Sequence, residues 1–318
     1  MVNEPSWHKL ENAVLESSPA NWEDARSAAG LTWEVEKHPV GVLHSDPDSY
    51  SYTVEHAGDW QAITRDDTQA VLSIQPKTYR VVTNKEFGGV IDTLLGIEKT
   101  EHVIFEALMS LYGGRQIVAL AYFEEPLKIP WDESQTYTYI AFSSRHDGQG
   151  GVRGIPTNVR VQCANTLSAA EALGKNTAFS IRHSSNFEER VADIGNQLKA
   201  ARMNSQEWLE GMQALALWSA TPRDVDVFLQ KMFPVSDDMT QRVMDNRLIN
   251  RSEVRNIYER SETTESIRGN GYGLLMATTE WADHVRPSRS SDAEVSRSLL
   301  LPSDPKFRAS KILSSMAS

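Results

Sequence analysis

The spacing of apolar residues divides the chain into two halves. Between residues 31 and 82 apolar and polar positions alternate, and Val, Thr, Tyr and Trp are frequent. This period of two predicts β-strands at 31–40, 50–65 and 70–82, with Pro76 marking a break or an edge in the third. The period then changes: apolar residues three and four apart predict a helix over 83–96, with Asn84 as its N-cap.

Two apolar segments follow, at 101–112 and 115–125, separated by Gly113 and Gly114. A glycine pair between extended segments is typical of a tight β-hairpin. Both faces of these strands are apolar, so we expect them to lie centrally with cover on both sides. Because one sheet's neighbours need not supply all of that cover, we also expect self-association around 103–123.

Further strands are predicted at 135–143 and 158–164, followed by a short helix over 165–175. Beyond about residue 177 the period is helical, with helices expected at 186–203, 221–233, 237–248, 251–261, 271–285 and 304–317 and a linker at 286–304. Thr221 and Pro222 form a helix-start signal. The predicted fold class is therefore α+β: a mostly antiparallel sheet with packed helices, followed by a helical C-terminal part.

We expect three regions: an N-terminal arm over 1–30, an α+β core over 31–185 with a glycine-rich loop, and a helical part over 186–318 that packs on the core. The single cysteine, Cys163, excludes a disulfide framework within one chain and suits a reducing cytoplasm. Its position in a strand pattern favours a buried structural role. No apolar run is long enough to cross a bilayer, so a cytoplasmic protein without a membrane partner is expected.

Charge is unevenly distributed. The chain has a net charge of −11, which argues against general coating of duplex DNA. Residues 141–185, the central segment, contain five basic and two acidic residues, so this segment is +3 and the remainder is −14. The five basic residues are Arg145, Arg153, Arg160, Lys175 and Arg182. Either the excess is a chance feature of a solvated loop or it marks an anion site.

Strand alternation bears on this choice. If Val159, Val161 and Cys163 face inward, Arg160 faces outward beside the glycine-rich loop. Backbone amides of that loop and of the expected helix start at Thr166 would add donors for a phosphate. The central segment can thus build an anion site without any catalytic group.

Motifs of common enzymes are not found. The lysine-containing phosphate loop, the dinucleotide-binding glycine spacing, the zinc-binding helix and the serine nucleophile elbow are all missing from the sequence. The runs Arg145–Asp147 and Ala282–His284 each place a His beside an Asp, a combination that also arises by chance. We therefore expect no enzyme activity, no cofactor and no metal.

Several segments resemble a known family. The runs SRHDGQGGVRGIPTNVRVQCANTLSAA, SIRHSSNFEERV and GYGLLMATTEWADHV are similar to phage- and plasmid-encoded proteins catalogued as domain of unknown function 932. The similarity extends in order over residues 33–316. It implies a mobile element in a bacterial host. In coarse architecture the chain also resembles single-strand annealing recombinases of the Red-beta and Erf type, which implies single-stranded DNA binding and a homo-oligomer.

Three functions remain open. The first is single-stranded DNA binding or annealing in recombination or replication, with the five basic residues of the central segment on phosphates. Strand tyrosines would stack on bases or simply pack in the fold: Tyr79, Tyr112, Tyr122, Tyr137 and Tyr139. The second is an acidic protein-binding module that inhibits or redirects a host factor. The third is a hydrolase or nuclease assembled from dispersed Asp, Glu and His residues.

Overall fold

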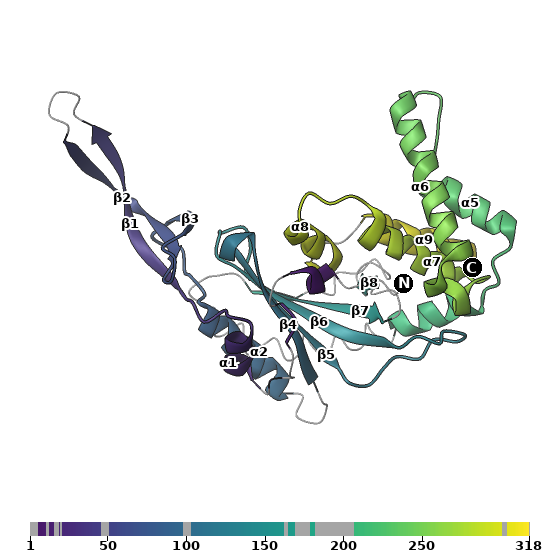
Figure 1. Ribbon diagram of the computed structural model, residues 1–318, viewed down its shortest axis with the longest axis horizontal. Helices are drawn as coiled ribbons and strands as arrows, with labels where there is room; N and C mark the ends of the chain where they lie inside the picture. The colour runs from purple at the N-terminus through teal and green to yellow at the C-terminus, as the bar shows by residue number, and fades with distance from the viewer. Residues whose placement is uncertain are drawn as a thin grey trace.

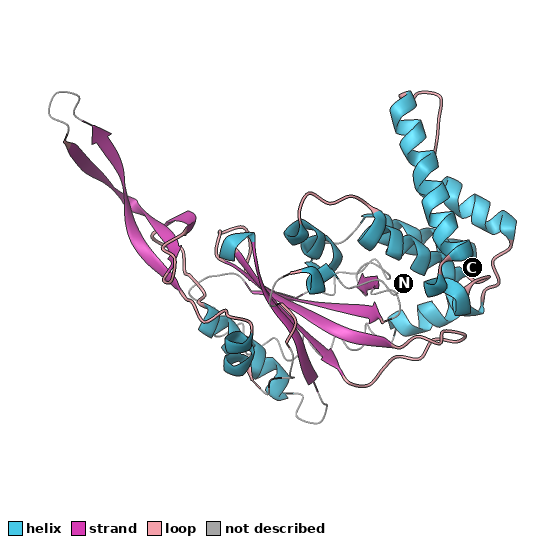
Figure 2. Cartoon of the chain, viewed as in Figure 1, coloured by secondary structure: helices cyan, strands magenta, loops and turns pink. Residues whose placement is uncertain are grey.

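The computed structural model describes residues 6–10, 13–15, 19, 21–45, 51–97, 103–161, 165–168, 179–181, 207–300 and 304–317. The chain is elongated, with a long β-hairpin at one end, a β-sheet in the middle and helices at the other end (Figures 1 and 2). The α+β class with a helical C-terminal part is confirmed. None of the helices in these ranges is long and apolar enough to cross a membrane.

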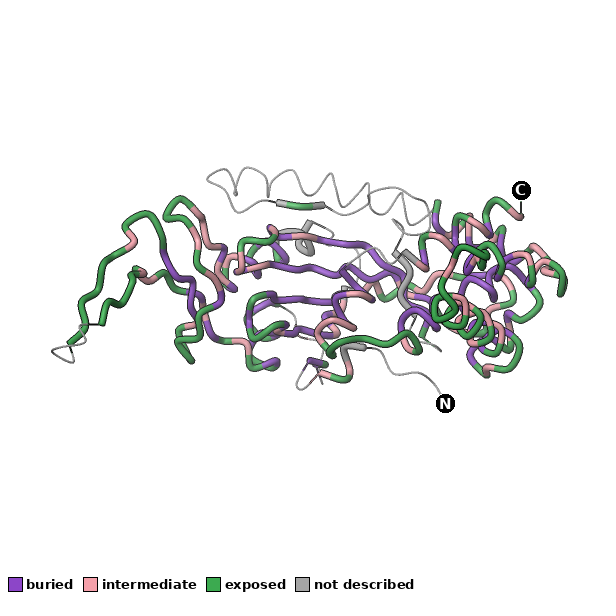
Figure 3. The backbone as a smooth tube through the Cα atoms, turned by 90° about the horizontal axis from the view of Figure 1, so that it is seen from above, coloured by how far each residue is buried: buried purple, intermediate pink, exposed green. Residues whose placement is uncertain are grey.

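The N-terminal sheet has three antiparallel strands in the order β1 (Val35–Ser45), β2 (Tyr52–Arg65) and β3 (Val71–Pro76). At its base, Val35, Ile63 and Leu72 are buried. The outer parts of β1 and β2 project beyond the rest of the molecule and are exposed along their length (Figure 3). Pro76 ends β3, as expected for a residue that cannot donate a ladder hydrogen bond.

The main sheet consists of β4 (Val103–Leu111), β5 (Gln116–Phe123), β6 (Thr136–Arg145), β7 (Val152–Arg160) and β8 (Asn165–Ser168), in that order. A further strand, β9 (Phe179–Ile181), pairs with β7, and all pairings are antiparallel. The predicted β4–β5 hairpin is confirmed. Its turn is the short 3-10 helix η2 (Tyr112–Gly114), in which Gly113 has a φ of 70° and Gly114 a φ of 102°.

Both faces of the main sheet are covered, as the sequence predicted. One face packs with the base of the hairpin sheet and with the helices α1 (Trp22–Ala28) and α2 (Asn84–Ile97). The other packs with α8 (Ser291–Val295) and the π-helical turn η5 (Ser296–Leu300), while η1 (Ser6–Lys9) lies against α8. Residues 286–304 are thus not a plain linker, because Val295, Leu299 and Leu300 are buried on the sheet. Since this cover comes from the chain itself, β4 and β5 give no reason for self-association.

Helix α2 begins differently from the prediction. Thr83, not Asn84, is the cap: its hydroxyl accepts from Glu86 N at 3.1 Å, and Glu86 Oε2 accepts from Thr83 N at 2.9 Å. This reciprocal pair is a capping box. Within α2, a Cβ on Gly88 would lie 1.9 Å from Cδ1 of Trp22. The glycine that weakens the helix therefore lets α1 approach closely.

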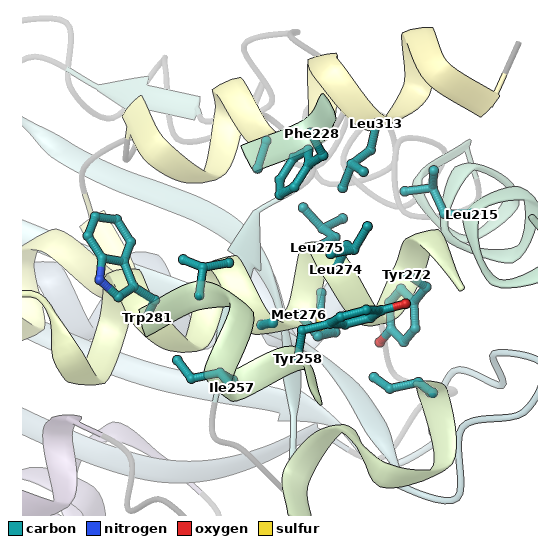
Figure 4. Close-up of a cluster of buried hydrophobic side chains, with 14 of the residues drawn as sticks. Leu215, Phe228, Ile257, Tyr258, Tyr272, Leu274, Leu275, Met276, Trp281 and Leu313 are labelled. Carbon is teal, nitrogen blue, oxygen red and sulfur yellow. The ribbon is translucent and has the colours of Figure 1, made fainter. Parts of the chain in front are cut away.

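The helical part contains a helix at 207–217, α5 (Pro222–Met232), α6 (Gln241–Arg260), η3 (Glu262–Ile267), α7 (Gly271–Glu280), the π turn η4 (Trp281–Val285) and α9 (Asp304–Ala317). Every residue of α7 is buried, and the other helices pack around it (Figure 4). Thr221 and Pro222 open α5 with a capping box, as predicted. The two helices expected at 237–248 and 251–261 form one continuous helix, α6.

The helix predicted at 165–175 is wrong where the structure describes it. Asn165–Ser168 forms β8, in which Asn165 pairs with Arg160 and Thr166 with Val159. Residues 169–178 lie outside the described ranges. The edge of β7 offers ladder hydrogen bonds to the returning chain, and this tertiary pairing overrides the local helical preference.

Candidate functional site

The glycine-rich turn between β6 and β7 joins the two sheets. Ser73 Oγ donates to the carbonyl of His146 at 2.7 Å, and Gln75 Nε2 donates to the carbonyl of Asp147 at 3.0 Å. Gly148 has a φ of 74°, and a Cβ there would lie 2.4 Å from Gln75 Nε2. The glycine thus allows close packing of the turn on β3.

Arg145 is held within this turn. Its Nε donates to Asp147 Oδ1 at 2.9 Å, Nη2 donates to Oδ2, and Nη1 donates to Gln116 Oε1 at 3.3 Å. Burial opposes ionisation of Asp147, but hydrogen bonds from Arg145 and from Gln149 N outweigh it and lower the pKa of this carboxyl. The charge of Arg145 is therefore neutralised inside the turn.

Arg160 is buried, which contradicts the outward orientation expected from strand alternation. The residue is 1% exposed, whereas Val161 is 50% exposed. Its Nε and Nη2 each donate to Asp132 at 2.7 Å, and Nη1 donates to the carbonyl of Thr263 at 2.6 Å. Alternation failed because β7 is covered on both faces and ends at Arg160. Arg160 ties the sheet to η3 of the helical part.

The structure describes only one of the other three basic residues of the central segment. Arg153, on β7, is half-buried, and its guanidinium makes no hydrogen bond or ion pair with the part of the chain that is described. Lys175 and Arg182 lie outside the described residues, as does Cys163. The central segment thus offers one described arginine without a partner, and its proposed phosphate site is not assembled by Arg145 or Arg160.

Four of the five candidate tyrosines are buried or half-buried, whereas Tyr112, in the β4–β5 turn, is 37% exposed. Tyr139 is 7% exposed and donates to Glu106 Oε2, and burial together with that carboxylate raises the pKa of Tyr139. The rings of Tyr122 and Tyr137 meet edge to face, 5.4 Å apart. Burial and the charge of Asp147 raise the pKa of Tyr79 to about 12.

In each candidate acid–base run, one residue makes a buried structural contact. His146 is fully buried, with Nε2 at 3.0 Å from Asn84 Oδ1. Asp283 forms a buried ion pair with Lys306 at 2.6 Å. Among the described residues no group of three His, Cys, Asp or Glu is placed to hold a metal ion.

The structure brings together cations that sequence reasoning missed. Three arginines from two helices meet the C-terminal end of α5: Arg247 and Arg251 from α6, and Arg308 from α9. Arg251 donates to the carbonyl of Phe233 from Nε at 2.9 Å and from Nη2 at 2.6 Å. Arg308 Nη2 donates to the carbonyl of Lys231 at 3.0 Å, and Arg247 Nη1 donates to that of Pro234. We call these three residues the α5 arginine cluster.

The α5 arginine cluster retains unused donors and net charge. Each guanidinium has five N–H donors, of which Arg247 and Arg308 use one here and Arg251 uses two. All three side chains are half-buried, and none forms an ion pair with a carboxylate of the described chain. Arg255, one turn further along α6, is paired with Asp226 and Glu259.

Cations at a helix C-terminus are stabilised by the helix dipole and satisfy the last carbonyls. That role needs only a small share of the donors that three guanidinium groups supply. The remaining donors, on a rigid helical frame, have the chemistry that recognises phosphate oxygens. Exposed Asp238 interacts electrostatically with the cluster: hydrogen bonds from Ser236 and from its own backbone, together with the charge of Arg247, lower the pKa of Asp238.

A sequence signal for the cluster exists. Arg247, Arg251 and Arg255 recur four residues apart, which places them on one stripe of a helix. The signal was missed because two shorter helices were predicted there, and because Arg308 lies far away in sequence. No local pattern predicts that α9 contacts the end of α5.

Comparison with known proteins identifies the family. A family model described as Domain of unknown function (DUF932) matches residues 71–300. The chain belongs to this family. The DUF932 match begins at β3, ends at η5, and includes Arg160, Arg247 and Arg251 but not the long strands β1 and β2. No curated protein and no solved structure matches the chain.

Proposed function

We propose that this chain is a non-enzymatic accessory protein of a phage or plasmid that binds single-stranded DNA during recombination or replication. The α5 arginine cluster is the observation that supports this proposal best. It concentrates three cations that have no carboxylate ion pair among the described residues, on a protein of net charge −11. Phosphates are the ligands, and the cytoplasm of a bacterial host is the expected location.

Binding of this kind is independent of base sequence. Guanidinium groups that contact phosphates release counterions from the strand, so affinity falls as salt rises. The acidic remainder of the chain repels the polyanion and confines contact to the basic surface. Arg153 is a secondary contact on the main sheet, while Arg145 and Arg160 are assigned to the fold.

The acidic protein-binding module remains the second candidate. The exposed β1–β2 hairpin favours it, because residues 35–65 contain five acidic and two basic residues. Glu36, Glu55 and Asp59 are exposed on it. A surface of this sign suits a host protein with a basic groove, whose function the module would block or redirect.

A fluorescence anisotropy titration with labelled oligothymidylate tests the DNA proposal. The variant Arg247→Gln/Arg251→Gln/Arg308→Gln removes the cluster and keeps long polar side chains on both helices. Its matched control, Lys77→Gln/Lys85→Gln/Lys128→Gln, removes the same charge from exposed positions outside α5, α6 and α9. We expect the cluster variant to lose more than about tenfold in affinity and the control to lose much less, since charged hydrogen bonds are worth about 1.5–3 kcal/mol each.

Thermal melts of all three proteins verify that they are folded at the assay temperature. Equal losses in the two variants would show that only total charge matters and would refute the assigned site. If the wild type fails to bind oligothymidylate even at about 20 mM salt, where such binding is strongest, the DNA proposal is wrong and the protein-binding module takes its place.

A further inference from the structure

The outer part of the β1–β2 hairpin is an exposed two-stranded ribbon. In this hairpin arm, Gly41–Ser45 pairs with Tyr52–His56, and Leu43 lies directly opposite Val54. Leu43, Val54 and Tyr52 share one face and are 61%, 55% and 66% exposed. A two-stranded hairpin is at best marginally stable alone in water, so an arm with such a face needs a covering surface.

A second exposed apolar surface lies at the opposite end of the molecule. The C-terminal half of α6 is anchored in the core by Val254, Ile257 and Tyr258. Its N-terminal half projects from the helical part (Figure 1) and exposes Leu248 and Ile249 at 50% and 53%. Like those of the hairpin arm, these apolar side chains are exposed to water, and burying them in an interface would be favourable.

The two surfaces are complementary in charge. Residues 35–65 carry a net charge of −3, from five acidic and two basic residues. The N-terminal half of α6, residues 241–250, carries +1, from two arginines and one acidic residue. Both surfaces therefore combine an apolar centre with charges of opposite sign, the pattern of a specific protein interface.

We propose that the hairpin arm of one copy docks on the N-terminal half of α6 in a second copy of this chain. The arm and α6 lie at opposite ends of an elongated molecule, so a single copy is not placed to join its own two surfaces (Figure 1). Contact between different surfaces is heterologous, and it generates a closed ring or an open filament. The assembly is tested without DNA, so its failure can be told apart from failure of the proposed function.

Two double variants test the interface in light scattering coupled to size exclusion, at micromolar concentration without DNA. Leu43→Thr/Val54→Thr removes the apolar arm face and keeps strand propensity. Leu248→Gln/Ile249→Gln removes the helix face and keeps helix propensity. Leu217→Gln is the control, because Leu217 is 66% exposed but lies on another helix. Circular dichroism melts check that each variant is folded.

The wild type and the Leu217→Gln control are expected to form multimers, while each double variant alone has the mass of one chain. Loss of two Leu- or Val-sized contacts weakens association by more than about tenfold. An equimolar mixture of the two double variants should form a dimer and stop there, because each retains the surface that the other lacks.

Three results would overturn the proposal. A wild type with the mass of one chain shows that the surfaces do not join. Multimers of the Leu248→Gln/Ile249→Gln variant equal to those of the wild type show that the arm binds another arm or another face. A mixture that remains at the mass of one chain shows that arm and helix are not partners.

Discussion

Arg160 and Arg251 are both arginines that donate to a backbone carbonyl in the helical part, yet their surroundings differ. Arg160 also pairs through two bonds with Asp132, and the residue is 1% exposed. Arg251 gives both of its bonds to the carbonyl of Phe233 and has no carboxylate partner among the described residues. The first guanidinium is neutralised in the fold, whereas the second keeps its charge and several donors at the surface.

The difference shows that the local excess of charge in a sequence does not locate a binding surface. The central segment has a net charge of +3, but its own Asp147 and the distant Asp132 neutralise two of its arginines. The α5 arginine cluster arises from residues 57 positions apart or more between α6 and α9, on a part of the chain with many acidic residues. An arginine that pairs with a carboxylate has a structural role, whereas one without such a pair is available to a ligand. The number of basic residues in a segment does not make this distinction.

The largest expected effect is on the buried pair. Arg160→Ala leaves Asp132 buried without its cation and should lower the free energy of unfolding by about 3–5 kcal/mol. Urea unfolding measures this loss. The double variant Arg160→Met/Asp132→Leu should recover most of it, since no buried charge remains. An Arg160→Ala protein as stable as the wild type would show that Arg160 does not hold the sheet to the helical part.

A smaller effect is expected in the glycine-rich turn. Asp147→Asn weakens the hydrogen bonds from Arg145 and should cost about 1–3 kcal/mol. Because folding lowers the pKa of Asp147, its stabilisation is present above the ordinary aspartate pKa of 3.8 and is lost as the pH falls through the folded value. Thermal melts between neutral and acidic pH should therefore show a gap between wild type and Asp147→Asn that narrows toward low pH. If the difference in melting temperature between wild type and Asp147→Asn does not change with pH, Asp147 is not stabilised as an ionised partner of Arg145.

A single substitution in the α5 arginine cluster should lower the free energy of unfolding by less than Asp147→Asn does. Arg251→Gln removes a cation from the C-terminal end of α5, worth about 0.3–1 kcal/mol of unfolding free energy. Its effect on DNA affinity should be the larger one. A loss of several kcal/mol in urea unfolding would place Arg251 with Arg160 among the structural arginines.

Arg153 should show the smallest effect on stability. It has no partner in the described chain, so Arg153→Gln should change the unfolding free energy by no more than about 0.5 kcal/mol. If it contacts phosphate, the variant should still bind single-stranded DNA more weakly than wild type. A large destabilisation would reveal a structural contact instead.

Much of the fold follows from the sequence because its elements have local causes. The period of two predicted β1, β2 and β6, and the glycine pair predicted the β4–β5 hairpin. The capping signal of Thr221 and Pro222 placed the start of α5 correctly. In each case a few neighbouring residues determine the backbone conformation, and tertiary packing agrees with them.

The failures have tertiary causes. Asn165–Ser168 forms a strand because it pairs with the edge of β7. Arg160 is buried because both faces of β7 are covered by other parts of the chain. Alternation separates inward from outward residues only where one face of a sheet meets solvent. The site was missed for a related reason, since Arg308 reaches α5 from the last helix of the chain.

The salt dependence of single-stranded DNA binding tests the separation of the arginines most directly. Anisotropy titrations across about 50–200 mM salt should give a steeper plot of log affinity against log salt for wild type than for Arg247→Gln/Arg251→Gln/Arg308→Gln. Three lost phosphate contacts predict a difference in slope of about 2, at roughly 0.7 for each contact with a single strand. The control Lys77→Gln/Lys85→Gln/Lys128→Gln should keep the wild-type slope. Equal slopes for the wild type and the cluster variant would contradict the assignment of the α5 arginine cluster to phosphate.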